Sequence, residues 1–134
     1  MRPVIPMTGR RVTVPWRLGQ YGIPAQTAVG ISILLLHHRE DLYPEPFAFK
    51  PERWLDPDGR AVKPGTYELI PFGGGTRRCL GAALAMAEQR VVLRAMARRL
   101  DLEAASPRPK RPRHRNVTMI PSRGGRVIVR SRLA

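Results

Sequence analysis

The chain has 134 residues, 43% of them hydrophobic, which is enough for one modest domain with a core. It carries 24 lysines and arginines against 10 acidic residues, a formal charge of +14. Its one cysteine, Cys79, cannot form an internal disulfide, which indicates a reducing compartment, the cytoplasm. No secretory leader is visible, and the longest apolar run, residues 28–36, is too short to cross a bilayer, so we expect no membrane span.

The positive charge allows two interpretations. It is typical of proteins that bind nucleic acid or an acidic partner. It is also compatible with a piece of a larger protein whose charges balance. The positive residues are almost all arginines and are spread along the chain, which favours the second interpretation.

Residues 1–36 predict sheet strands. Residues 11–14 alternate and include β-branched side chains, so they predict a short strand, and residues 21–24 predict a turn. Residues 27–36 begin like a strand and end in an apolar run. Periodicity alone leaves that run open between a helix and a buried strand.

Residues 37–71 predict an irregular meander. Residues 37–42 favour a short helical turn, and the stretch from Tyr43 to Gly75 holds too many prolines for a long helix. Three histidines, His37, His38 and His114, could in principle bind metal. Neighbouring residues on a helix or strand point apart and none of the three has a partner at metal-site spacing, so we expect no metal role for them.

Residues 80–100 give the strongest helix prediction in the chain. The segment is rich in Ala, Leu, Met, Glu, Gln and Arg, contains no proline and has only Gly81, in its first turn. Apolar residues recur three to four positions apart, while Arg90, Arg94 and Arg98 form a row on another side. We therefore expect an amphipathic helix with a basic stripe.

Residues 101–134 predict a basic loop followed by a C-terminal hairpin. Residues 107–115 are proline-rich and basic, like a nucleic-acid-binding arm, but no aromatic residues interleave, so a solvated loop is favoured and we expect no nucleic-acid partner. Residues 117–120 and 126–129 predict two strands joined by the turn signal at 121–125.

Residues 72–81 read Phe-Gly-Gly-Gly-Thr-Arg-Arg-Cys-Leu-Gly and carry the most specific chemistry. The glycines let the backbone turn sharply and approach a flat ligand closely. Cys79 stands at the mouth of the predicted helix, where the helix dipole and free N–H groups favour negative charge on sulfur, and Arg77 and Arg78 add positive charge. A cysteine in this position is a good soft ligand for iron. The alternatives are an inert buried cysteine and a phosphate cradle, but the Lys-Ser/Thr pair of such a cradle is missing.

The spacing F-x-x-G-x-R-x-C-x-G resembles the haem-binding signature of the cytochromes P450, and this sequence fills all five fixed positions with Phe72, Gly75, Arg77, Cys79 and Gly81. Upstream, the segment Pro-Glu-Arg-Trp at residues 51–54, preceded by two phenylalanines, resembles the P-E-R-F segment of the same family. The resemblance runs over residues 1–129 and corresponds to about the last third of such a protein.

The resemblance implies a role for each of these residues. Cys79 would be the axial thiolate ligand of the iron of haem b. Arg77 would pair with a haem propionate, Phe72 would shield the sulfur, and Gly81 would let the helix start lie against the porphyrin. Arg10 would lie near a propionate, with Arg11 as the alternative, and Arg53 would join a structural charge network with an upstream E-x-x-R helix.

The implied fold is the C-terminal part of the cytochrome P450 fold, mainly α with small β-sheets and incomplete. It would comprise sheet strands (1–36), the meander (37–71), the cysteine loop (72–81), the helix (80–100) and the basic loop with its hairpin (101–134). With parts of the fold missing, apolar faces should lie exposed.

The implied activity is a haem-thiolate monooxygenase that oxidises a small organic substrate with O₂ and electrons from a ferredoxin- or flavoprotein-type partner. The family's oxygen-activating residues are absent, so we expect a truncated form that is inactive alone. Two other functions stay open: a degenerate, non-catalytic fragment, and a small basic nucleic-acid-binding protein.

Overall fold

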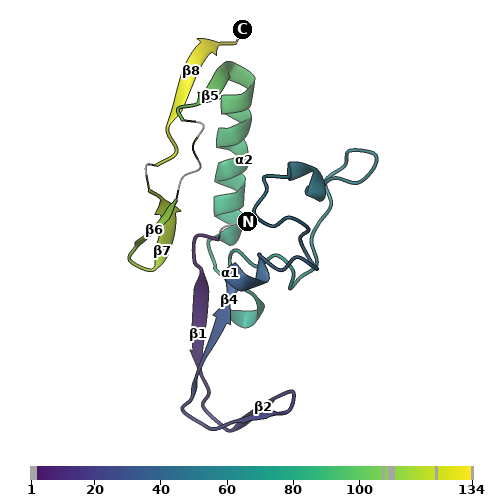
Figure 1. Ribbon diagram of the computed structural model, residues 1–134, viewed down its shortest axis with the longest axis vertical. Coiled ribbons are helices and arrows are strands. Elements are labelled where there is room, and N and C mark those ends of the chain that lie inside the picture. Colours follow the sequence, from purple (N-terminus) through teal and green to yellow (C-terminus); the bar gives the residue numbers. More distant parts are fainter. Residues whose placement is uncertain (1–2, 107, 109–110, 123, 134) are drawn as a thin grey trace. The chain divides into compact units, whose positions relative to one another are not determined.

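A computed structural model describes residues 3–106, 108, 111–122 and 124–133 (Figure 1). The chain forms two compact units, Met1–Gly74 and Gly75–Ala134, and each is described by itself.

The first unit begins with two antiparallel strand pairs. Strand β1 (Met7–Arg11) pairs with β4 (Ala28–Ser32), and between them in the sequence β2 (Trp16–Leu18) pairs with β3 (Tyr21–Ile23) (Figure 1). Gly19, at φ 58°, makes the turn between β2 and β3 in a conformation that suits glycine. The β2–β3 hairpin therefore lies within the connection between β1 and β4, and each pair forms its own two-stranded sheet.

A short helix follows the outer hairpin directly. Helix α1 (Ile33–Leu36) is capped by Ser32, whose Oγ accepts a hydrogen bond from the Leu35 N–H at 3.2 Å. The 3₁₀ turn η1 (Pro51–Trp54) and a bridge between Leu55 and Ala61 are the regular elements described in the rest of this unit. The sequence left residues 27–36 open between a helix and a buried strand, and the structure forms strand β4 there followed by helix α1.

The core of the first unit is small and partly aromatic. Ile33, His37 and Tyr43 are buried. The ring of Tyr43 meets that of His37 edge-on, with centroids 6.4 Å apart, and lies 5.9 Å from that of Trp54. These contacts hold the end of α1 against the start of the meander.

The second unit is built on one long helix. The 3₁₀ turn η2 (Gly75–Arg77) leads to α2 (Ala82–Arg99), followed by β5 (Leu100–Ala104), β6 (Pro112–Arg115), β7 (Thr118–Pro121) and β8 (Val127–Arg132). Strand β5 pairs with β8 and β6 pairs with β7, both antiparallel (Figure 1). Within this unit the described residues bury only Ala82, while Leu84, Val91 and Leu93 on α2 lie exposed. The expectation of exposed apolar faces is therefore confirmed.

Several sequence predictions are confirmed in type. The helix predicted at 80–100 is observed at 82–99, Cys79 lies in irregular chain one short turn before it, and the meander contains no long helix among its described residues. A mainly α fold is not confirmed, because the described residues form eight strands and only two α-helices.

Four local predictions are wrong in whole or in part. A strand was predicted at residues 11–14, but it lies at residues 7–11, because residues 7–11 pair with β4. A turn was predicted at residues 21–24, but residues 21–23 form strand β3, because the chain already reverses at Gly19. The C-terminal hairpin is absent, because β7 pairs with β6 and β8 pairs with β5. Part of the predicted basic loop is therefore strand β6.

Some predictions fall outside the described residues. These are Pro107, Pro109 and Lys110 of the loop, Arg123 of the predicted turn, and Met1 and Arg2 at the start of the chain.

No helix in the part of the chain that the structure describes combines the length and the apolar character needed to cross a bilayer.

Candidate functional site

The cysteine loop is shaped by glycines with left-handed backbone. Gly73 has φ 73° and Gly75 has φ 63°, conformations that cost most other residues about 1 kcal/mol or more. Gly75 opens the 3₁₀ turn η2, and its carbonyl accepts a hydrogen bond from the Arg78 N–H at 3.2 Å. The loop thus needs glycine at these positions to bring Cys79 to the mouth of α2.

Cys79 is exposed and forms no disulfide. Its carbonyl accepts a hydrogen bond from the Ala82 N–H at 3.3 Å, so the cysteine is tied to the first turn of α2. Gly81 occupies the N-cap position and has no side chain to cap the helix, which leaves the positive end of the helix dipole facing the loop. A Cβ atom added at Gly81 would lie 3.9 Å from the Cys79 Sγ and would occupy space beside the sulfur.

The donors available here suit iron held in a macrocycle. Among the described residues there is no group of three His, Cys, Asp or Glu side chains that could hold a metal ion. The iron of a haem is bound by four porphyrin nitrogens and needs one further ligand from the protein, for which an accessible cysteine sulfur is suitable. The single exposed thiol of Cys79 therefore fits a haem, which needs one ligand from the protein.

Two arginines precede the cysteine on the same loop. Arg77 ends η2, and both Arg77 and Arg78 are exposed. Neither side chain makes an ion pair or hydrogen bond with any described residue, so both guanidinium groups can receive a carboxylate.

The other predicted site residues belong to the first unit. Phe72 is half-buried. The Nη1 of Arg10 on β1 donates to the Gly9 carbonyl at 2.7 Å and to the Thr8 Oγ1 at 3.2 Å. Arg11, the alternative to Arg10, is exposed. The structure thus groups Gly75, Arg77, Cys79 and Gly81 in one unit and places Phe72, Arg10 and Arg53 in the other.

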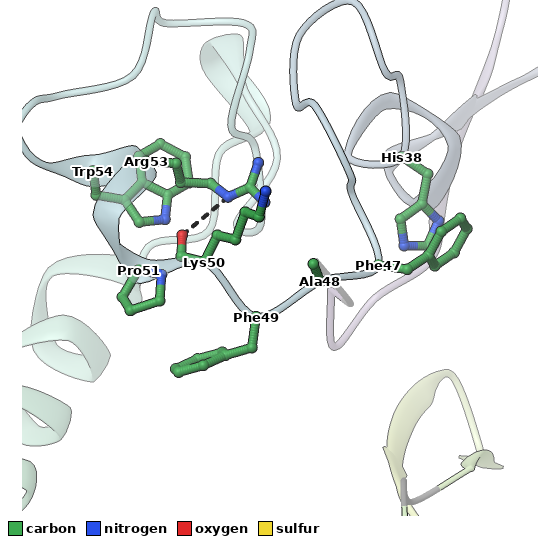
Figure 2. Close-up of a pocket in the computed structure, with 8 residues that line it drawn as sticks. All are labelled: His38, Phe47, Ala48, Phe49, Lys50, Pro51, Arg53 and Trp54. Carbon is green, nitrogen blue, oxygen red and sulfur yellow. Dashed lines mark hydrogen bonds between the residues drawn. The ribbon is translucent and has the colours of Figure 1, made fainter.

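Arg53 fastens the meander. Its guanidinium donates to the backbone carbonyls of Lys50 at 3.1 Å, Pro44 at 3.1 Å and Glu45 at 3.3 Å. Figure 2 shows the bond to Lys50. The meander thus folds back on one side chain, an arrangement that the sequence analysis missed because it sought a charged partner for Arg53.

A hollow of about 350 Å³ lies beside Arg53 (Figure 2). His38 and Phe47 stand at one end of it with ring centroids 4.6 Å apart, and Trp54 and Pro51 stand at the other. The hollow belongs to the meander and contains no residue of the cysteine loop.

His37 is a second residue whose role the sequence analysis missed. It is 1% exposed, and its Nε2 accepts a hydrogen bond from the Ile70 N–H at 3.0 Å. Burial is the main cause that lowers the pKa of His37 below its ordinary value of 6.5, and the neighbouring His38 adds to it. A neutral ring is what this hydrogen bond requires, since Nε2 must accept. The signal was a histidine directly after an apolar run.

Tyr43 lies beside His37. Burial raises the pKa of the Tyr43 phenol, and the negative charge of Glu68 contributes. Its hydroxyl is buried and has no hydrogen-bond partner within the described chain. The phenol therefore packs as an aromatic ring and stays neutral.

The sequence resembles known proteins over almost its whole length. The family model described as Cytochrome P450 matches residues 1–129. The protein named "Putative cytochrome P450 135B1" from Mycobacterium tuberculosis is 42% identical over 131 residues, which cover 98% of this chain and 27% of that protein. "Putative cytochrome P450 138" from Mycobacterium bovis is 41% identical over 132 residues, covering 98% of this chain and 29% of that protein.

These relatives extend well beyond the matched region. The chain spans between 27% and 29% of the length of the curated relatives named above. Membership in their family implies a haem cofactor, in agreement with the exposed thiol at the start of α2. From the family match and the identity to these relatives, the chain belongs to the cytochrome P450 family.

Proposed function

We propose that this chain is the haem-thiolate part of a cytochrome P450 monooxygenase and that Cys79 is the axial ligand of the haem iron. The observation that carries the proposal is the exposed Cys79 on a glycine-shaped loop at the positive end of α2. The cofactor would be haem b, which is held by one axial side chain and by contacts to its propionates. The single cysteine of the chain fits a reducing compartment such as the cytoplasm.

The loop residues divide the work of binding. Cys79, in the exposed loop before the first turn of α2, offers its sulfur to the iron. Arg77 binds a propionate by a charge-assisted hydrogen bond, and Gly81 leaves room beside the sulfur for a flat ring. Phe72 and Arg10 belong to the other unit, and their proposed roles, shielding the sulfur and pairing with a second propionate, rest on the resemblance to the family signature.

The proposed reaction inserts one atom of O₂ into a small organic substrate. Two electrons and two protons reduce the other oxygen atom to water, and a ferredoxin- or flavoprotein-type partner supplies the electrons. The bound haem supplies the oxygen chemistry, and the thiolate ligand donates electron density to it. This chain contributes the ligand and its support, so we expect it to bind haem and to show no turnover by itself.

Reconstitution with haem tests the assignment of Cys79. Purified chain is mixed with haemin, reduced and exposed to carbon monoxide, and the absorption spectrum is recorded. The expected result is the red-shifted band of a thiolate-ligated haem. Cys79→Ser should abolish that band, while Ser106→Ala, which removes a hydroxyl outside the loop, should leave it unchanged.

Two results would contradict the proposal. A band of the imidazole-ligated type in the natural chain would assign the ligand to a histidine. A spectrum that is the same in the natural chain and in Cys79→Ser, recorded with a thiol-free reductant, would show that Cys79 does not bind the iron.

A further inference from the structure

A second candidate site lies at the far end of α2 from the cysteine. A hollow of about 640 Å³ forms where the last turn of α2 meets strands β5 and β8. Its lining residues are Ala95, Met96, Arg98, Arg99, Leu100, Arg132 and Leu133, all within the second unit. The volume falls in the range of small-molecule sites, roughly 300–1,000 Å³.

The strand pairing explains why three arginines converge there. Leu100 is the C-cap residue of α2 and the first residue of β5, and it lies opposite Arg132 on β8. The Leu133 N–H donates to the Arg99 carbonyl at 2.9 Å, which ties the end of β8 to the end of the helix. Arg98 and Arg99 in the last helical turn thus lie beside Arg132, which is distant in sequence.

These arginines have no acidic partner among the residues that the structure describes. Arg98, Arg99 and Arg132 make no ion pair and no side-chain hydrogen bond with the described residues, whereas Arg130 on the same strand pairs with Glu103. Part of the charge of Arg98 and Arg99 complements the negative end of the helix dipole. Arg132 belongs to a strand, so the dipole does not account for it, and the cluster retains an excess of positive charge.

The rest of the lining is apolar. Met96 and Leu100 are half-buried and form part of it with Ala95, and Leu133 is exposed. Guanidinium groups match carboxylate and phosphate oxygens in bidentate geometry, and an apolar floor favours an alkyl or aryl tail. Charge complementarity and the apolar lining thus call for a ligand with both properties.

We propose that this hollow binds an amphipathic organic anion, an oxyanion headgroup held by Arg98, Arg99 and Arg132 with an apolar tail on Met96 and Leu100. The proposal does not depend on haem binding, because none of its residues belongs to the cysteine loop.

Calorimetric titration of the full chain with four probes tests this proposal. The probes are decanoate, decyl phosphate, decanol and inorganic phosphate, each kept below micelle-forming concentrations. We expect one or both of the decyl anions to bind at least about tenfold more tightly than decanol and inorganic phosphate, because neither half of the ligand suffices alone. The tighter of the two anions identifies the headgroup as carboxylate or phosphate.

Matched variants separate the site from general attraction to a basic protein. Arg99→Ala/Arg132→Ala should weaken binding of the decyl anion by about tenfold or more, since two charge-assisted contacts are lost. Arg113→Ala/Arg115→Ala removes the same charge from the exposed strand β6 and should change binding by less than about twofold. Circular dichroism confirms that α2 is retained in both variants.

Shortening the tail gives an independent measurement. Each CH₂ removed between decanoate and hexanoate should weaken binding by about two- to fourfold if the tail lies on the apolar floor. Equal affinity for decanol and decanoate, equal losses in the two double variants, or affinity that ignores tail length would each overturn the proposal.

Discussion

The two units of the chain differ in how their charges are balanced. Residues 1–74 carry nine basic and seven acidic residues, whereas residues 75–134 carry fifteen basic and three acidic residues. Three of the four ion pairs among the described residues lie in the first unit, Arg39–Asp41, Lys50–Glu45 and Arg60–Asp58, and one, Arg130–Glu103, lies in the second. The first unit therefore supplies its own counter-charges and the second does not.

The contrast is narrower for apolar side chains, because large apolar residues such as Phe47 and Phe49 lie exposed in the first unit too. Ile33 and Tyr43 are buried with His37 in the first unit, while α2 exposes Leu84 and Val91. A helix of 18 residues with exposed leucine and valine draws little stability from packing within its own unit. The comparison teaches that the second unit, which carries the cysteine, has unbalanced positive charge suited to acidic partners, whereas the first unit balances most of its charge internally.

The largest expected effect comes from truncating the core of the first unit. Ile33→Ala should lower the free energy of unfolding by about 2–4 kcal/mol, because Ile33 is 2% exposed and a cavity would remain. Leu84→Ala, at a position 65% exposed, should cost less than about 1 kcal/mol. Urea denaturation followed by circular dichroism measures both. Equal losses would show that α2 is packed as firmly as α1.

The buried histidine predicts a pH dependence confined to the first unit. Its pKa is lowered in the folded chain, so below about pH 6.5 the unfolded chain binds a proton that the folded chain excludes. Stability should therefore be fully present above pH 6.5 and fall as the pH drops towards the lowered pKa of the folded state. Protonation of His37 would break the hydrogen bond that its Nε2 accepts from the Ile70 N–H. Loss of a hydrogen bond to a buried polar group lowers the free energy of unfolding by about 1–3 kcal/mol.

Two histidine variants assign this pH dependence. His37→Gln should flatten the change in urea midpoint between pH 7.5 and pH 5, because glutamine does not titrate. His114→Gln, on the exposed strand β6, should leave it intact. If both variants keep the full pH dependence, its source is a carboxylate elsewhere in the chain.

Removal of the Arg53 side chain, which binds three carbonyls of the meander, should lower the free energy of unfolding by less. Arg53→Ala deletes three hydrogen bonds to backbone carbonyls and should cost about 1–2 kcal/mol, since these carbonyls lie near the surface and can bind water instead. Arg60→Ala, which breaks an exposed ion pair with Asp58, serves as the matched loss of an arginine and should cost about 0–1 kcal/mol. Proteolysis between residues 44 and 53 should increase in the first variant alone.

The smallest expected effect concerns the basic stripe of α2. In a complete P450 that carries this segment, neutralising Arg90 and Arg94 together should slow reduction by the electron-transfer partner about two- to fivefold at low ionic strength, because exposed charges chiefly set the encounter rate. Added salt should shrink the difference. Stopped-flow reduction kinetics measure it, and rates unaffected by the double substitution would identify the stripe as an ordinary solvated helix face.

The sequence predicted local features well where one signal dominated. Helix α2 follows from a proline-free stretch rich in Ala, Leu and Arg, and the loop before it from its glycines. The position of Cys79 at the helix mouth could therefore be predicted. The roles of Arg77, Phe72 and Arg10 towards haem stay predictions.

Strand pairing could not be predicted in the same way. The Gly124 N–H donates to the Pro121 carbonyl at 3.1 Å within the predicted turn, but the strands before and after it pair elsewhere. Strand β8 lies against β5, more than twenty residues earlier, and β7 lies against the basic proline stretch. Which strands meet depends on contacts that are distant in sequence and leave no local pattern. The bonds of Arg53 to carbonyls were missed for a similar reason, because backbone acceptors carry no sequence signature.

Each sheet formed by the described residues has just two strands, so each strand presents one edge to the outside. Strand β8 is the most hazardous of these edges, because Val127, Ile128 and Val129 are all exposed on it. Such an edge is a template for a strand from another copy of the chain. Arg132 lies three positions after Val129 and makes no ion pair with the described residues, so it acts as a gatekeeper, since like charges on approaching copies repel. Salt screens this repulsion, so aggregation of the chain should start earlier in concentrated salt than in dilute buffer.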